Sequence, residues 1–236
     1  MLITIAVCCG CGFSIERVKP ANENTRDIVR YESPQDCYDA MTIAASQDDF
    51  EAALDCMTVE TQQQLGGLLL YRGHLNRVAA DYAMFRGDKR GEGTQAAITA
   101  MNEIFDRYKI DAKVLNNLPP FTAQTLSDTV AMRQLGKRIN DIHGFTSAML
   151  SLLAKLNPGK APLQVLDGEL TIDESSEDTA KGTIVSGDAT EQVQFRRIEG
   201  GWQIVLEVSG LTQQSRPATS KEPSRTPGPD ALDNLE

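Results

Sequence analysis

Apolar residues recur at helical spacing through the first two thirds of the chain and alternate with polar residues in the last third. Ser33 suits a helix cap and Pro34 the first helical position, and one apolar face follows them. A second short helix is predicted to start at Asp48, and two helices joined so tightly run antiparallel. The apolar positions of these two predicted helices are Cys37, Ala40, Met41, Ala44, Phe50, Ala53, Leu54 and Met57.

A third and longer helix is predicted to follow Thr58, whose hydroxyl can cap it. Gly66, Gly67 and Gly73 interrupt its apolar stripe, which indicates a kink or a close crossing with another helix. The stripe consists of Leu65, Leu68, Leu69, Leu75, Val78, Ala79, Tyr82 and Phe85.

More helical segments follow a charged loop at residues 87–93. A proline pair at residues 119–120 breaks the helical spacing, and Asn157-Pro158-Gly159 ends it. The helical segments predicted here span residues 94–108, 124–142 and 145–156.

From residue 163 the spacing of apolar residues changes to strict alternation, with turns rich in Gly, Asp and Ser. One strand face is then buried and the other wet, as in an antiparallel sheet with helices on one side. The fold class is therefore α+β, with a helical N-terminal half packed on a C-terminal antiparallel four-stranded meander. The predicted strands span residues 163–172, 180–186, 191–198 and 202–208.

The chain opens on an uncharged apolar run that ends in small residues and cysteines. This pattern is typical of an export signal, and Gly10-Cys11 suits the junction where a bacterial lipoprotein is cleaved and acylated. The run is too short to span a bilayer, so membrane attachment would be through lipid. The alternative is an amino-terminal strand of a cytosolic protein. The predicted organisation is a signal at 1–11, a tether at 12–32, one domain at 33–210 and a disordered tail at 211–236.

Composition and charge narrow the classes of function. The 236 residues, 41% of them hydrophobic, suffice for one packed domain. A net charge of -10 leaves no basic stripe to neutralise phosphates, so nucleic acid is not an expected partner. Of five cysteines only Cys37 and Cys56 belong to the predicted domain, which excludes a thiolate metal cage. We expect neither a metal nor a cofactor.

Cys37 lies about as far before the turn at Gln47 as Cys56 lies after it. The two thiols can therefore meet across the helical hairpin, and an oxidising exterior would favour a disulfide between them. The alternative is a pair of buried, reduced thiols that pack as small hydrophobic groups.

Three segments of the chain carry a family resemblance. They are Ser33-Pro34-Gln-Asp-Cys-Tyr, with the later Ala-Ser-Gln-Asp-Asp-Phe-Glu-Ala-Ala-Leu, and Phe195-Arg-Arg-Ile-Glu-Gly-Gly-Trp202. They resemble the nuclear-transport-factor-2-like or cystatin-like superfamily, especially its uncharacterised bacterial lipoproteins. The resemblance implies a curved, cone-like sheet, here with an enlarged helical insertion over residues 58–162. That fold hosts isomerases, dehydratases and inert binding modules, so the resemblance concerns shape more than chemistry.

The two histidines are the first candidates for acid–base chemistry. His74 lies between Tyr71 and Asp81 on the long predicted helix, so these residues and Tyr82 could line a cavity. The competing interpretation is a polar residue on the flank of a helix. His143, followed by Gly144, is predicted to end a helix, where an imidazolium suits the dipole, and receives no catalytic role.

Two further features have structural interpretations. The acidic run at residues 173–178 lacks the alternating oxygen ligands of a calcium loop and predicts a solvated hairpin turn. Trp202 shares a strand face with Ile204, Leu206 and Val208, which predicts a core aromatic residue rather than a pocket.

The sequence favours a non-enzymatic, lipid-anchored protein of the cell envelope whose α+β domain binds a protein or small-molecule partner on the extracytoplasmic side. One alternative is a small isomerase or hydrolase with a pocket between helices and sheet, using Tyr71, His74, Asp81 or Tyr82. Another is a structural subunit that forms homo-oligomers through its open sheet face.

Overall fold

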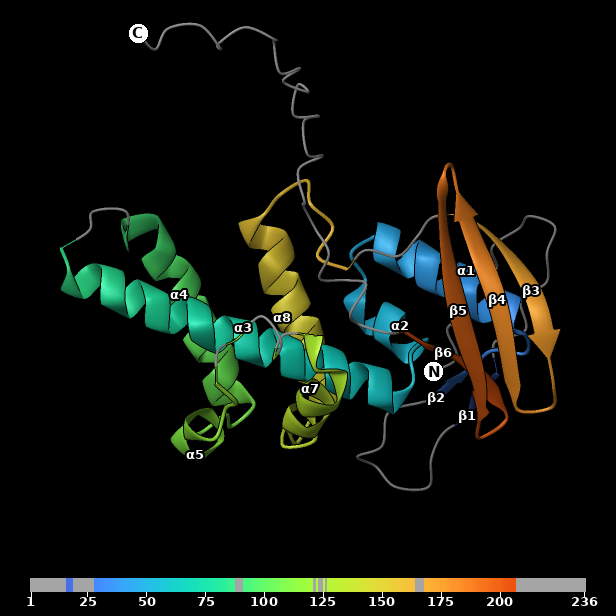
Figure 1. The fold of residues 1–236 in the computed structure, drawn as a ribbon, viewed down its shortest axis with the longest axis horizontal. Helices are drawn as coiled ribbons and strands as arrows, with labels where there is room; N and C mark the ends of the chain where they lie inside the picture. Colours follow the sequence, from blue (N-terminus) through green and yellow to red (C-terminus); the bar gives the residue numbers. More distant parts are fainter. Residues whose placement is uncertain are drawn as a thin grey trace, which may run out of the picture.

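Figure 1 shows the chain as a computed structural model, which describes residues 16–18, 28–87, 91–120, 122, 125, 127–163 and 168–206. The helices are α1 (Pro34–Ser46), α2 (Phe50–Asp55), α3 (Val59–Phe85), α4 (Gly91–Arg107), α5 (Ala112–Asn116), α7 (Thr129–Gly136) and α8 (Ile142–Leu156). The strands are β1 (Glu16–Val18), β2 (Ile28–Arg30), β3 (Glu169–Ser175), β4 (Thr179–Ser186), β5 (Ala189–Ile198) and β6 (Gly201–Val205). Cys11 and the predicted tail at 211–236 lie outside the described residues.

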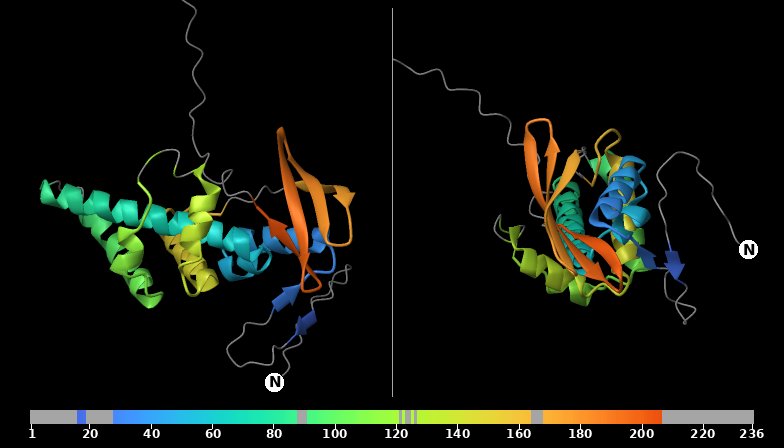
Figure 2. Two further views of the ribbon diagram at one scale, coloured as in Figure 1. Left: turned by 60° about the horizontal axis from the view of Figure 1, so that its bottom comes forward. Right: turned by 90° about the vertical axis from the view of Figure 1, so that its right-hand side faces the viewer.

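The predicted α+β class is confirmed. Strands β3, β4, β5 and β6 form an antiparallel meander in that order, and the helices precede it in the chain. The end-on view in Figure 2 shows α1 packed against one face of this sheet. Strand β3 begins at Glu169, later than predicted, although Leu163 is buried before it. Within the predicted tether, β1 pairs with β2. The sequence did not predict these two strands, because three residues are too few to show an alternation of apolar and polar positions.

The two faces of the sheet differ in polarity. The inner face is apolar and buried, and its residues include Leu170, Ile184, Val193, Phe195, Trp202 and Ile204. On the outer face Thr183 donates a hydrogen bond of 2.6 Å to Asp173 and accepts one of 2.7 Å from Gln192. Trp202 is 6% exposed, so its predicted place in the core is confirmed. The acidic run at residues 173–178 is exposed as predicted, but only residues 176–178 form the hairpin turn, since Asp173 and Glu174 belong to β3.

Side-chain caps fix where the helices begin. Ser33 and Thr58 cap α1 and α3 as predicted, each accepting a hydrogen bond from the backbone N–H three residues on. The predicted start of the second helix at Asp48 is wrong by two residues: α2 starts at Phe50 with Asp49 as its cap, and Asp48 has a φ of 54°. The helix predicted to start at Thr94 begins three residues earlier, at Gly91.

The long helix predicted over residues 124–142 is wrong in extent. Helix α7 ends at Gly136, and Asp141 caps a new helix, α8, that starts at Ile142. Ile139 lies in the connecting turn and is 5% exposed. Its burial keeps the apolar spacing continuous through the turn, which is why the spacing did not reveal the break.

Helix α3 is crossed at close range by α7, as its glycines predicted. A Cβ atom added to Gly67 would collide with the backbone carbonyl of Met132, and one added to Gly136 would collide with the backbone of Gln63. The two backbones therefore lie so close together that both contact positions must be glycine. Nearer the sheet, Gln62 on α3 donates hydrogen bonds to the carbonyls of Leu54 and Met57.

The last strand joins the sheet to the helical half. Ile204 donates a hydrogen bond of 2.8 Å to the Cys56 carbonyl and accepts one of 3.0 Å from Thr58, so the α2–α3 connection pairs with β6 in parallel. The backbone N–H of Trp202 donates a hydrogen bond to the carbonyl of Tyr31, and the backbone N–H of Leu206 donates one to the hydroxyl of Thr61. Helices and sheet thus share one hydrophobic core.

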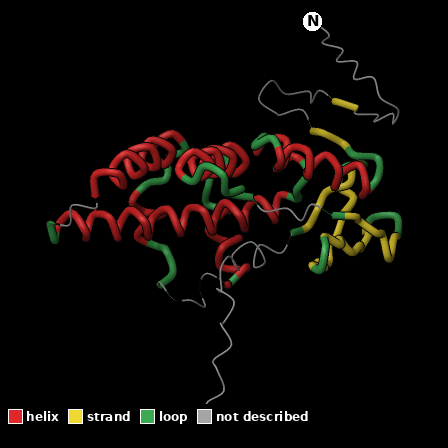
Figure 3. The backbone as a smooth tube through the Cα atoms, turned by 90° about the horizontal axis from the view of Figure 1, so that it is seen from above, coloured by secondary structure: helices red, strands yellow, loops and turns green. Residues whose placement is uncertain are grey.

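Beyond the crossing, α3 continues away from the sheet as an arm, and α4 returns along it (Figures 1 and 3). With a rise of about 1.5 Å per residue, α3 is about 40 Å long. Ile98 and Met101 of α4 are buried, and Met101 lies against Gly73 of α3. We call residues 72–85 of α3, the following residues Arg86 and Gly87, and residues 94–102 of α4 the outer arm.

Candidate functional site

The four predicted catalytic candidates lie along α3 in different environments. Tyr71 is buried, and its hydroxyl donates hydrogen bonds of 3.2 and 2.9 Å to the carbonyls of Pro119 and Pro120. Burial raises the pKa of Tyr71. This hydroxyl therefore holds the loop after α5 against α3, which is a structural role.

His74 is half-buried, and its Nδ1 atom lies 3.3 Å from Nη2 of Arg77. Burial lowers the pKa of His74, and the charge of Arg77 lowers it further. Asp81 is exposed, and Tyr82 is 61% exposed with the guanidinium of Arg86 stacked 5.8 Å from its ring centroid. The contacts of these residues lead to separate neighbours rather than to one another.

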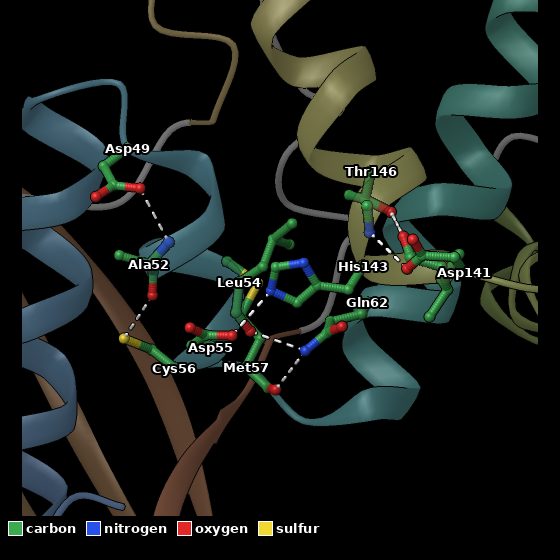
Figure 4. A network of polar contacts seen from close by, with 12 residues as sticks. Asp49, Ala52, Leu54, Asp55, Cys56, Met57, Gln62, Asp141, His143 and Thr146 are labelled. Carbon is green, nitrogen blue, oxygen red and sulfur yellow. Dashed lines mark hydrogen bonds and ion pairs between the residues drawn. The ribbon is translucent and has the colours of Figure 1, made fainter. Parts of the chain in front are cut away.

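His143 forms a pair that the sequence did not indicate. Its Nε2 atom lies 2.9 Å from Oδ1 of Asp55, with the two side chains 13% and 23% exposed (Figure 4). The predicted helix C-terminus at His143 is wrong, because Asp141 caps α8 and accepts from the backbone N–H of Gly144. His143 is therefore in the first turn of α8 and reaches across to the end of α2. The Asp141 cap was the only local signal for this placement.

The surroundings of this pair tie three helices together. Gln62 donates hydrogen bonds of 2.8 and 3.0 Å to the carbonyls of Leu54 and Met57, which flank Asp55 (Figure 4). Tyr108 packs edge-on against Phe145, and its pKa is raised by burial and by the nearby carboxylate of Asp141. A carboxylate-oriented imidazole can transfer protons. Here the pair connects α2 to α8 within a polar network.

A buried cluster of one phenol and two thiols lies beside the sheet. Cys37 and Cys56 are both 0% exposed and carry free thiols. The Cys37 thiol donates to the Cys56 carbonyl at 3.4 Å, and the Cys56 thiol lies 3.2 Å from the Tyr31 hydroxyl. Burial raises the pKa of Cys37, and its hydrogen bond with the Cys56 thiol raises it further. The two cysteines are neighbours, as the spacing predicted, and the disulfide stays a prediction.

The described residues contain no group of three or more His, Cys, Asp or Glu side chains suited to hold a metal ion. Among the same residues, no helix is both long enough and apolar enough to cross a membrane.

Among the described residues, the most exposed large apolar side chains lie on the outer arm. Val78, Tyr82 and Phe85 follow one another at intervals of four and three residues, so they lie on one face of α3, and we call them the arm stripe. They are 49%, 61% and 89% exposed. The inner part of the same predicted stripe is buried, since Leu65, Leu68 and Leu69 are at most 6% exposed. The sequence predicted the stripe, but it did not indicate how far along α3 the packing of the neighbouring helices extends.

No protein-family model, curated protein or solved structure matches the chain. The resemblance to the nuclear-transport-factor-2-like or cystatin-like superfamily therefore stays a prediction, and the class that the fold defines is α+β.

Proposed function

We propose that the protein is a lipid-anchored extracytoplasmic binding protein without enzymatic activity, and that the arm stripe is the surface by which it docks onto a protein or lipid partner. The exposure of this stripe is the observation that carries the proposal. Phe85 is 89% exposed at the end of a helix in which Leu65, Leu68 and Leu69 of the same stripe are buried. Contiguous apolar side chains left in solvent mark binding surfaces in folded proteins.

Comparison with the sheet favours the arm as the docking surface. The outer face of the sheet carries polar and charged side chains, including Lys181 paired with Glu174 at 2.9 Å and Arg196 lying 3.7 Å from Glu60. Val185 is the one large apolar side chain of β4 that is more than a third exposed, at 45%. Assembly through the sheet would bury these charges, whereas docking through the arm stripe would bury apolar surface.

Photo-crosslinking in the native host tests the docking role. A photoreactive phenylalanine analogue at position 85 should give adducts that the same analogue at Gln192, on the exposed outer face of the sheet, does not give. Adducts of any class, whether lipid, another protein or a second copy, support the proposal. Identical patterns at the two positions, or none at position 85, would contradict it.

Mass spectrometry of protein from the native host tests the lipid anchor separately. The Gly10-Cys11-Gly12 junction motivates the expectation of a mature chain that starts at Cys11 and carries an acyl mass. A mature chain that keeps an unmodified Met1 would rule the anchor out and leave the docking role untouched.

A further inference from the structure

The outer arm differs in charge from the rest of the chain. Together with the loop that joins its two helices, residues 72–102, it carries five cations against three carboxylates. The whole chain has a net charge of -10, and residues 168–206, which hold the sheet, carry eight carboxylates against three cations. The arm therefore presents a cationic end, and the acidic sheet lies at the other end of the molecule (Figure 1).

The arm stripe combines this charge with aromatic side chains. The Arg86 guanidinium lies over the ring of Tyr82, next to the exposed Phe85. Aromatic rings with a polar edge are enriched where membrane meets water, and arginine stems lie along apolar surface while the guanidinium reaches the headgroups. Each cation near an anionic surface contributes about 1 kcal/mol of attraction.

The size of the stripe bears on the kind of partner. Three side chains, only partly exposed in two cases, offer at most a few hundred Å² of apolar area, whereas a stable protein partner covers roughly 800 Å² on each side. A bilayer needs no complementary shape, and the strength of binding to it grows with the apolar area inserted and with the attraction between cations and anionic lipids. The position of Phe85 at the last residue of α3 suits such insertion.

We infer that the arm stripe docks on the surface of an anionic lipid bilayer, with Phe85 and Tyr82 inserted among the headgroups and Arg77 and Arg86 facing lipid phosphates. This inference rests on the proposed docking function and names its partner. A second copy of the chain and a protein partner are the two other occupants that the experiment distinguishes.

Depth-dependent quenching of tryptophan fluorescence tests the inference. The full chain has one tryptophan, Trp202, which is buried, so a second tryptophan placed on the surface reports its own surroundings. Phe85→Trp places the probe on the stripe, and Val185→Trp places it on the outer face of the sheet as the matched control. Both variants keep the same amino-terminal apolar run, so binding through that run is common to them.

The variants are mixed with vesicles of brominated phosphatidylcholine, with and without phosphatidylglycerol. We expect Phe85→Trp to lose fluorescence and shift to shorter wavelength on vesicles that contain phosphatidylglycerol, more than on phosphatidylcholine alone, while Val185→Trp matches the parent. Equal quenching of the two variants, or quenching of Phe85→Trp that ignores phosphatidylglycerol, overturns the inference. If position 85 still forms crosslinks in the host, the docking function stands, and the mass of those adducts separates a protein partner from a second copy.

Discussion

Cys37 and Cys56 are completely buried neighbours, and their chemistry depends on the redox conditions around the chain. With a disulfide oxidant such as oxidised glutathione, the two thiols lose two protons and two electrons and form one bridge, and the oxidant is reduced to two glutathione thiols. We expect peptide mapping of oxidised protein to recover a peptide containing Cys37 linked to one containing Cys56. Both cysteines still alkylated as free thiols after unfolding of the oxidised protein would contradict this prediction.

The reduced pair predicts an alkaline limit to stability. Burial raises the pKa of Cys37 in the folded chain, and it also raises the pKa of Tyr31. The thiol of Cys37 ionises above about pH 8.5 in the unfolded chain, where the folded chain still holds its proton. Its contribution to the free energy of unfolding is therefore fully present below that pH and falls as pH rises. The slope reaches at most about 1.4 kcal/mol per pH unit for each group.

Urea unfolding under reducing conditions, from about pH 7.5 to about pH 9.5, measures this slope. Cys37→Ala should lower stability at every pH but flatten the slope, because the buried thiol that resists ionisation is gone. A slope unchanged by the substitution would show that Cys37 is not its source.

At the scale of elements, the crossing of α3 and α7 depends on Gly67. Gly67→Ala would push a methyl group into the carbonyl of Met132, and a backbone cannot yield as a side chain can. We expect a loss of about 1–3 kcal/mol or more in the free energy of unfolding.

Gly73→Ala on the same helix is the control. Its Cβ would meet the flexible ends of Met101 at 3.0 Å and Met149 at 3.2 Å. The cost of moving these side chains is offset by the gain in helix propensity from Gly to Ala, about 1 kcal/mol. We therefore expect Gly73→Ala to change the free energy of unfolding only slightly. Equal losses in urea unfolding for the two variants would mean that the close crossing does not set the stability of this pair of helices.

Helix-capping residues and the alternation of apolar and polar residues in strands made most elements predictable from the sequence, because both signals are local. Ser33 and Thr58 begin their helices as predicted, and Trp202 alternates into the core. The Asp55–His143 pair joins residues 88 positions apart, and no local pattern reports such a contact. The same limit hid the parallel pairing of Met57 with Ile204.

Periodicity also identifies an apolar face without saying what covers it. Leu68 and Phe85 belong to one stripe by spacing, yet the first is 4% and the second 89% exposed. The difference arises because α7 and α8 pack on the inner turns of α3, whereas α4 accompanies the outer turns. The candidate docking surface therefore became visible only from the packing of helices that are distant in sequence.

The whole molecule divides its apolar residues between folding and binding. Its core is continuous from α1 and the sheet to α4 and α8. The arm stripe lies beyond that core, at the cationic end of an acidic chain. A docking role requires that the side chains of the arm stripe contribute little to folding and remain free to dock.

Urea unfolding of Phe85→Ser tests that requirement most directly, with Phe105→Ser as the matched core substitution on the neighbouring helix. Phe105 is 2% exposed, and its truncation should cost about 3–5 kcal/mol through lost burial and the cavity left behind. Phe85 is 89% exposed, so Phe85→Ser should change the free energy of unfolding by no more than about 0.5 kcal/mol. A loss of well over about 1 kcal/mol at Phe85 would mean that another part of the chain covers the stripe, and would contradict its role as a docking surface.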